Sequence, residues 1–457
     1  MTQQKQNGNL VAIITMFFLF AMISFVTNLA APIGTIWGYK FEGNSVLGMM
    51  GNMMNFLAYL FMGIPAGNLL VKIGYKKTAL WAMGIGAIGL AVQYLSSLVG
   101  GDVTMFTLNG EVDRGGVLTQ IEIPVTLNYF IYLLGAFICG FCVCMLNTVV
   151  NPMLNLLGGG GNRGNQLIQT GGALNSLSGT LTPLFVGALI GSLTKATTMS
   201  AVAPLLWIAI GIFIASFIII SFVSIPEPHM HKGKDAKEKF EHTPWAFRHT
   251  TLGVIGIFIY VGIEIGVPGT LNFYLSDYEV SGLDKSTASS IAGAVVAIYW
   301  LLMLVGRSLS SIISSKVSTR AQLITVSAVA ILLVLLAIFT PNDVRVSMPG
   351  YSAGNGFTMA EVPMSAMYLV LCGLCTSVMW GGIFNLAVEG LGKYTAQASG
   401  IFMMMVVGGG ILPLVQSWIS DVAGYMTSYW LIIGCLAYLL YYGLAGCKNV
   451  NKDIPVD

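Results

Sequence analysis

The polar side chains with the clearest potential for chemistry in this sequence stand inside long apolar stretches, and most of them are amides. Amides both donate and accept hydrogen bonds, which suits a ligand covered with hydroxyl groups. An anionic ligand would call for Lys or Arg, which we place in none of these stretches, and a cation would call for several carboxylates. The pattern favours a neutral polyhydroxylated ligand, although pairing between helices could account for about half of the amides. The amides are Asn28, Asn52, Asn55, Asn147, Asn151, Gln166, Gln169, Asn175, Asn272, Asn385 and Gln416.

Flat aromatic rings could supply the second part of such a site, because the apolar face of a pyranose packs on a ring. Trp380 is the strongest candidate, since Gly381, Gly382 and Asn385 surround it in sequence and no charged residue does. Trp and Tyr also favour membrane interfaces, so an anchoring role is the alternative for each ring. The candidates are Tyr260, Phe273, Tyr299, Trp300, Trp380 and Phe384.

Glu264 is the one ionisable residue that we place deep in an apolar stretch. An isolated carboxylate is costly in an apolar helix bundle, which makes it a functional candidate. Three roles are open to it. It could exchange a proton as the two sides of a membrane open in turn, it could coordinate sodium, or it could accept hydrogen bonds from the ligand without any ion coupling.

The elements that must hold these side chains are transmembrane helices. Of the 457 residues, 55% are hydrophobic and only 9% are charged, against about a quarter charged in a soluble domain. A helix needs about 20 mostly apolar residues to cross a bilayer, where backbone groups find partners only within a helix or a closed barrel. The sequence predicts an all-α membrane protein with twelve spans, at about 10–34, 46–71, 78–99, 127–155, 166–194, 199–224, 250–276, 286–306, 321–340, 364–388, 394–420 and 425–447.

The charged residues predict the topology and the domain organisation. Sixteen of the 21 Lys and Arg residues fall on the side of both termini, which the positive-inside rule assigns to the cytoplasm. Segment 225–249 combines His229 and His231 with a Lys/Glu mixture, typical of a solvated linker rather than a metal site. We therefore expect an N-terminal six-helix half at 1–224, a cytoplasmic linker at 225–249 and a C-terminal six-helix half at 250–457.

The two halves resemble each other, which indicates a parallel internal repeat. Asn28 and Pro32 of the first span match Glu264 and Pro268 of the seventh with the same interval. Outer loops at 100–126 and 341–363 recur in register and are too polar to span. Two parallel repeats place a substrate site between the halves near mid-membrane. Paired glycines of the fifth and eleventh spans would allow rocking or only close packing; they are Gly171, Gly172, Gly179, Gly408, Gly409 and Gly410.

Other classes of function fit the sequence poorly. A net charge of +2 offers no broad basic face for nucleic acid, and Gly158-Gly-Gly-Gly161 lacks the lysine and hydroxyl residue of a phosphate-binding loop. We expect no metal or cofactor, because the seven cysteines and four histidines form no ligand pattern. We do not expect an enzyme, since no buried His or pair of acids is available. A sensor would need an output domain, for which the predicted linker has no room.

The sequence resembles the major facilitator superfamily, and within it the fucose, glucose and galactose permease family of bacterial sugar transporters. The resemblance implies the twelve-helix fold of two six-helix halves, sugar transport and a location in the bacterial inner membrane. The similar stretches occur in both halves. They are Phe17-Phe-Leu-Phe20 followed by Asn28 and Pro32, Ile64-Pro-Ala-Gly67, Asn147-Thr-Val-Val-Asn151-Pro152, Ala173-Leu-Asn175-Ser176, Tyr260-Val-Gly-Ile-Glu264, Gly306-Arg307 and Gly408-Gly-Gly-Ile-Leu-Pro413.

Two departures from the fucose permease branch bear on ion coupling. That branch carries an aspartate in the first span and a glutamate in the fourth for substrate binding and proton coupling, whereas Asn28 and Asn147 stand at these positions here. An amide cannot carry a transferable proton, so coupling would move to Glu264 in the second half. Asn175 matches a polar substrate-site position of the family. Val71 stands where an acid is usual after the second span.

The sequence therefore predicts a secondary transporter that imports a neutral monosaccharide, such as glucose or galactose, by alternating access and with coupling to protons or sodium. An uncoupled facilitator is the main alternative, and a sugar sensor that transports nothing is a weaker one. The expected partners are the sugar, the coupling ion and the lipid bilayer, and the chain is expected to act as a monomer. The residues predicted to bind substrate are Asn28, Asn147, Asn151, Gln169, Asn175, Glu264, Asn272, Trp300, Trp380 and Asn385, with Glu264 also as the ion-coupling residue.

Overall fold

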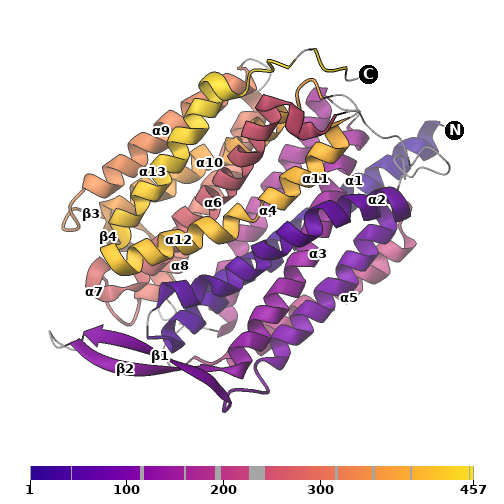
Figure 1. The fold of residues 1–457 in the computed structure, drawn as a ribbon. Helices are drawn as coiled ribbons and strands as arrows, with labels where there is room; N and C mark the ends of the chain where they lie inside the picture. The colour runs from indigo at the N-terminus through magenta and orange to yellow at the C-terminus, as the bar shows by residue number, and fades with distance from the viewer. Residues whose placement is uncertain are drawn as a thin grey trace.

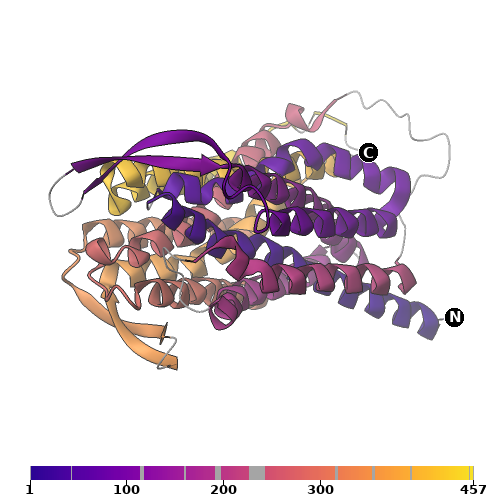
Figure 2. The same cartoon turned by 90° about the horizontal axis from the view of Figure 1, so that it is seen from below.

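The computed structural model is a bundle of long helices with two short β-hairpins at one end (Figures 1 and 2). Eleven helical segments of the described residues are long and apolar enough to cross a membrane. A twelfth helix, α4, is 30 residues long and richer in polar residues, and it packs between α1 and α8. The structure describes residues 2–42, 44–113, 118–158, 161–190, 197–225, 242–313, 317–352, 356–391, 394–451 and 453–455.

The first half of the chain contributes five long helices and one short 3₁₀ turn. Helix α1 packs against α2, α3 and α4, while α5 packs on the second part of α2. The bounds are α1 Thr2–Lys40, α2 Ser45–Leu95, α3 Leu127–Leu157, α4 Gly161–Ile190, the 3₁₀ turn Met199–Val202 and α5 Ala203–Phe222.

The second half repeats this arrangement with more interruptions. Helix α6 packs against α8, α10, α12 and α13, and α9 packs against α10 and α13. The bounds are the 3₁₀ turn Pro244–Ala246, α6 Arg248–Ser276, α7 Tyr278–Ser281, α8 Ala288–Ile313, α9 Thr319–Phe339, α10 Met364–Val388, α11 Thr395–Met405, α12 Gly408–Ala423, α13 Tyr425–Tyr441 and a π-helical turn Tyr442–Gly446.

In two places the helices do not correspond one to one with the spans. Helix α2 runs through two spans, Val46–Leu70 and Lys72–Leu95, and Gly74, with φ of 85°, bends the chain near the start of the second. Glycine adopts this left-handed conformation without the steric cost that a side chain would bring. Helices α11 and α12 form one span, Gly400–Ala423, with a break between them.

The two outer loops that the sequence left unassigned are antiparallel β-hairpins. Strands β1 (Thr104–Asp113) and β2 (Leu118–Thr126) pair with each other, as do β3 (Arg345–Ser352) and β4 (Gly356–Pro363). Each hairpin joins the third to the fourth span of its half. Figure 2 shows both hairpins toward the end of the bundle opposite to the two chain termini.

The two halves lie side by side and meet along two seams. In Figure 1 the indigo-to-magenta helices of the first half lie next to the orange and yellow helices of the second. Helix α2 packs against α11 and α12 in one seam, and α4 packs against α8 in the other. Most of the predicted linker, including His229 and His231, lies outside the described residues.

Candidate functional site

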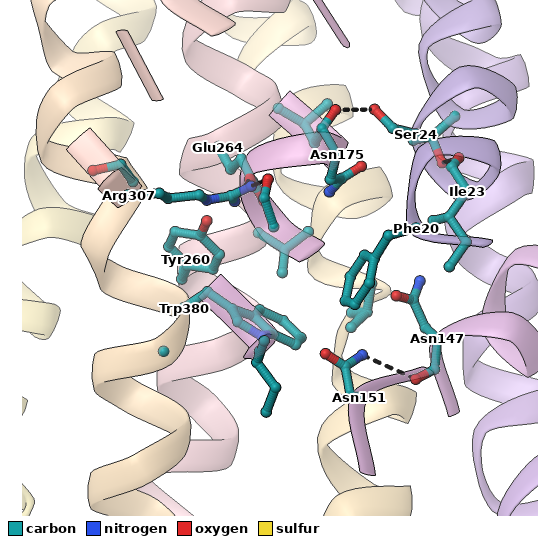
Figure 3. Close-up of a pocket in the computed structure, with 18 of the residues that line it drawn as sticks. Phe20, Ile23, Ser24, Asn147, Asn151, Asn175, Tyr260, Glu264, Arg307 and Trp380 are labelled. Atoms are coloured by element: carbon teal, nitrogen blue, oxygen red, sulfur yellow. Dashed lines mark hydrogen bonds and ion pairs between the residues drawn. The ribbon is translucent and has the colours of Figure 1, made fainter. Parts of the chain in front are cut away.

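A cavity of about 130 Å³ lies between the two halves and is lined by side chains from both (Figure 3). Helices α1 to α4 form one wall, which we call the N-terminal wall. Helices α6, α8, α10 and α11 form the other, the C-terminal wall. Eight of the ten residues that the sequence predicted for the site line this cavity: Asn28, Asn147, Asn151, Gln169, Asn175, Glu264, Trp300 and Trp380.

The N-terminal wall is built mainly from amides. Asn147 and Asn151 are four residues apart on α3, which places both on one helix face. Asn147 donates from Nδ2 to the Tyr59 hydroxyl at 2.8 Å, and Asn151 donates to the Asn147 carbonyl oxygen at 2.9 Å. Asn28 likewise donates from Nδ2 to the Ser24 carbonyl oxygen at 2.8 Å. These bonds fix the amide nitrogens, so the amide oxygens serve the cavity as acceptors.

A hydrogen bond between α1 and α4 holds these two helices together beside the cavity. Ser24 donates from Oγ to the carbonyl oxygen of Asn175 at 2.5 Å, and Figure 3 shows the two residues joined beside the cavity. Gly179, one turn further along α4, allows this close approach. A Cβ atom there would lie 3.2 Å from Asn28 Nδ2 and 3.4 Å from the Trp300 ring.

The C-terminal wall combines aromatic rings with the carboxylate. Tyr260 and Glu264 are four residues apart on α6 and face the cavity together. The Tyr260 ring lies 6.0 Å from the Trp380 ring, centroid to centroid, at an interplanar angle of 52°. The buried Tyr260 hydroxyl lies close to the Glu264 carboxylate one turn along α6. It therefore adds a polar group beside an aromatic surface.

The repeated spacing between a polar residue and proline has a structural explanation. Proline has no N–H, so the carbonyl four residues earlier loses its helical hydrogen-bond donor. Pro268 thus frees the carbonyl of Glu264, and Tyr299 donates to this oxygen from its hydroxyl at 3.3 Å. Asn28 stands in the same relation to Pro32 on α1. In each half the motif therefore frees a backbone carbonyl on a helix that lines the cavity.

Arg307 corrects the prediction that no Lys or Arg lies inside a span. It lies in α8 within the apolar segment Ala288–Ser310 and is only 7% exposed. Its Nη2 atom lies 3.3 Å from Glu264 Oε1 in an ion pair, and Figure 3 shows the guanidinium extending into the cavity toward that carboxylate. Glu264 is therefore not the isolated acid that the sequence suggested.

The reason for this error is local. We ended the eighth span at residue 306 because Arg307 follows it, whereas the helix continues through small and apolar residues to Ile313. The useful signal was that an apolar helical pattern resumes after the arginine. A single charged residue with apolar neighbours on both sides is better assigned to the helix and given a buried partner.

Two predicted site residues lie outside the cavity lining. Asn272 donates from Nδ2 to Thr35 Oγ1 at 3.5 Å, about two turns beyond Glu264 on α6. Asn385 lies on α10 beyond Trp380 and is also outside the lining. Another amide joins helices: Asn52 donates to the Gly409 carbonyl oxygen at 3.0 Å across the α2–α12 seam. Pairing between helices thus explains part of the amide set.

The paired glycines divide between the seams and the interiors of the halves. A Cβ atom on Gly172 would lie 3.4 Å from Arg307 Nη1, and one on Gly410 would lie 3.0 Å from the backbone of Met53, in both cases across a seam. Gly171 instead faces Phe20, and Gly408 faces the Phe258 backbone, within one half. Close packing is therefore present at all four, and rocking stays a prediction for the seam glycines.

Two six-span halves that enclose a polar cavity are the arrangement of a membrane transporter rather than an enzyme. The family model described as the Major Facilitator Superfamily matches residues 11–412. The chain therefore belongs to the major facilitator superfamily.

Individual relatives extend over nearly the whole chain. A protein named glucose/galactose transporter from Brucella abortus is 30% identical and covers 98% of this chain and 96% of its own length. The L-fucose-proton symporter of Escherichia coli is 22% identical and covers 90% of this chain and 86% of its own length. The crystal structure of the fucose:proton symporter in the outward conformation matches with a TM-score of 0.65 at 19% identity, covering 95% of this chain and 99% of that one. This likeness supports the fold.

Proposed function

We propose that this protein is a secondary active transporter that imports a neutral monosaccharide across a bacterial inner membrane, with both termini in the cytoplasm. In this proposal the halves at 1–224 and 250–457 move as two bodies about the cavity, joined by the linker at 225–249. The observation that carries the proposal is the composition of the cavity. Amides from the first half face aromatic rings from the second, and the charges of Glu264 and Arg307 balance each other.

The chemistry of the cavity favours a hexose. One bound water needs about 10–15 Å³ of such a cavity, so 130 Å³ holds about as many water-sized groups as a monosaccharide has non-hydrogen atoms. Amide oxygens accept hydrogen bonds from sugar hydroxyls, and Trp380 offers a flat surface to the sugar ring. The name of the Brucella relative, a glucose/galactose transporter, supports glucose or galactose as the first sugars to test.

Glu264 is the residue that we propose for ion coupling. It is the acid that lines the cavity, and Asn28 and Asn147 cannot take up a proton. Arg307 already lies 3.3 Å from this carboxylate, so sodium would need room for several oxygen ligands beside the guanidinium, whereas a proton needs only one carboxylate oxygen, which favours a proton as the coupled ion. An uncoupled facilitator is the alternative, supported by the two amides at positions where the fucose permease branch has acids.

Transport into sealed vesicles tests this proposal. The purified protein in proteoliposomes should exchange labelled glucose or galactose, and an inward proton gradient should drive accumulation above the external concentration. A sodium gradient should do so only weakly. Protein-free liposomes are the control. Absence of flux for every neutral hexose would contradict sugar transport, whereas exchange without gradient-driven accumulation would establish the facilitator.

A further inference from the structure

Arg307 contacts both halves of the molecule at once. Its Nη2 atom pairs with Glu264 on α6 at 3.3 Å, within the second half. Its Nη1 atom donates to Ser176 Oγ at 2.8 Å and to the carbonyl oxygen of Gly172, both on α4 of the first half. The side chain therefore crosses the α4–α8 seam while it remains bonded to the candidate coupling acid.

We propose that Arg307 is a positioning residue that links the protonation of Glu264 to the contact between the two halves. The proposal rests on the proposed coupling role of Glu264. In this proposal Arg307 has two sets of partners: the Glu264 carboxylate in its own half, and the oxygen atoms of Gly172 and Ser176 in the other half.

The position of these contacts determines which opening they control. Arg307 lies six residues before α8 ends at Ile313, on the side of the bundle where both chain termini lie (Figure 1). Gly172 and Ser176 lie near the middle of α4, which begins at this side at Gly161 and ends at Ile190. If the halves separate at the terminal end, Arg307 must break its hydrogen bonds to Gly172 and Ser176 on α4. Glu264 is then the remaining partner of the guanidinium among these three residues.

This dependence gives the linkage a direction. With Glu264 ionised, Arg307 keeps a neutralising partner after the halves separate, so opening at the terminal end is permitted. With Glu264 protonated, Arg307 depends on the Gly172 and Ser176 oxygens of α4, so opening would remove these acceptors after the ionic partner has already been lost. The closed terminal end therefore binds the proton more readily than the open one. A proton taken up with this end closed is released when it opens, which is the order that proton-driven import requires.

Few other groups near Glu264 and Arg307 could change their protonation in place of Glu264. Among the described residues, α6 and α8 present the Tyr260 and Tyr299 hydroxyls to this pair, and Cys372 of α10 lies behind Tyr299. The facing parts of α1 and α4 present Asn28, Asn175 and hydroxyl or backbone groups, none of which ionises. Glu264 is therefore the carboxylate whose protonation changes the charge of this cluster.

A distance measurement between the halves tests the linkage without any sugar. Spin labels at Phe222→Cys on α5 and Ile313→Cys on α8 report on the terminal end, because both side chains are exposed and lie in different halves. The seven native cysteines are buried, and labelling of the parent without the two new cysteines gives the background. We expect the long-distance population in lipid nanodiscs to rise about tenfold from acidic to alkaline pH.

Three variants decide the outcome. Glu264→Gln and Arg307→Gln should each remove the pH dependence, and Glu264→Gln should favour the short distance. Arg307→Lys keeps the charge but cannot bridge three partners in the same geometry, so it should weaken the dependence and serves if the glutamine variant does not fold. Arg320→Gln is the matched control, because the hydrogen bonds of Arg320 within the described residues go to the Gly443 and Leu444 carbonyls of its own half. It should retain the full pH response.

An unchanged pH response in both Arg307 variants would overturn the linkage, as would a parent whose distances do not depend on pH. Because the labels report in the absence of sugar, this result is separate from sugar transport. A protein that transports no sugar but shows the linkage contradicts the proposed function alone. One that accumulates sugar but retains its pH response in Arg307→Gln and Arg307→Lys contradicts this inference alone.

Discussion

The two walls of the cavity come from repeated halves with the same fold, yet their chemistry differs. The N-terminal wall presents uncharged amides that are held by hydrogen bonds within their own half, such as Asn147 on Tyr59. The C-terminal wall presents rings around one ion pair, Glu264 with Arg307. In the function that we propose, the first wall would recognise hydroxyl groups, and the second would provide stacking and respond to ions.

The repeat shows that the chemical difference between the two walls includes one pair of matching positions. Asn28 and Glu264 occupy matching places before Pro32 and Pro268, and both line the cavity from opposite sides. The backbone arrangement is common to both, including the carbonyl that the proline frees. Only the side chain differs, an amide in one half and an acid in the other. In our proposal a single ionisable position is sufficient for coupling, because Arg307 would change its partners.

The largest effect is expected from removing the charge of the C-terminal wall. Glu264→Gln retains shape and hydrogen bonding but cannot ionise, so gradient-driven accumulation should fall to equilibrium while exchange of sugar continues. Uptake and counterflow in proteoliposomes measure the two separately. Glu389→Gln, at the exposed end of α10, is the control and should accumulate sugar normally. Full accumulation by Glu264→Gln would remove the coupling role from this wall.

The aromatic part of the same wall should give the next largest effect. Trp380→Ala removes the surface on which a sugar ring would stack, and affinity should fall about tenfold or more, corresponding to about 1.4 kcal/mol or above. Trp380→Phe should retain most of the affinity because a flat ring remains. Sugar titrations of the three proteins provide the comparison, and equal affinities would assign Trp380 to packing against Tyr260.

A single amide of the N-terminal wall should contribute less than the ring. Asn147→Ala removes one hydrogen-bonding partner of the sugar, worth about 0.5–1.5 kcal/mol, so affinity should fall about two- to twelvefold. Accumulation driven by a gradient should persist, since this wall carries no coupling acid. Measured binding equal to the parent, together with lost accumulation, would reverse the roles that we assign to the two walls.

A smaller loss of sugar affinity is expected where Gly381 of the C-terminal wall meets Gln169 of the N-terminal wall. A Cβ atom on Gly381 would lie 2.6 Å from Gln169 Nε2, so Gly381→Ala must displace this flexible amide and should weaken binding about two- to threefold. Gly382→Ala is the matched control on the next residue, where the added Cβ would make only ordinary contacts, the nearest with Thr319 at 3.7 Å. Identical affinities for the two variants would exclude Gln169 from sugar binding.

The smallest effect is expected from the two amides outside the cavity. Asn272→Ala and Asn385→Ala should bind sugar within about twofold of the parent, because neither side chain lines the cavity. Membrane extraction and size-exclusion profiles check that the variants fold. A loss of affinity as large as that of Asn147→Ala would mean that the substrate extends beyond the walls described above.

The sequence predicted the fold well because each span carries its own signal of length and apolarity, and the charged residues between spans mark its ends. The same logic failed at Arg307, where a charge inside a helix was taken for a boundary. Partners from distant spans, such as Ser176 and Gly172, cannot be read from local composition. The hairpins were missed for a different reason: strands of alternating, mostly exposed residues resemble any polar loop.

Among the residues predicted for the site, those for which two signals coincided line the cavity. Asn147 and Asn151 share a helix face by their spacing, and Glu264 stands before a helical proline, so each had a positional argument as well as a polar side chain. Asn272 and Asn385 had only the polar side chain. Which face of a helix meets the cavity depends on how the two halves pack, and a single sequence does not specify that angle.

The most direct test of the account is the binding of a neutral hexose and its uronic acid to the purified parent protein, measured by calorimetry under identical conditions. The walls contain neutral amides and one balanced ion pair, so the account predicts that galactose or glucose binds and that the matching uronate binds at least about tenfold more weakly. Binding of the uronate as tightly as the hexose, or of neither sugar, would contradict a cavity built for a neutral monosaccharide.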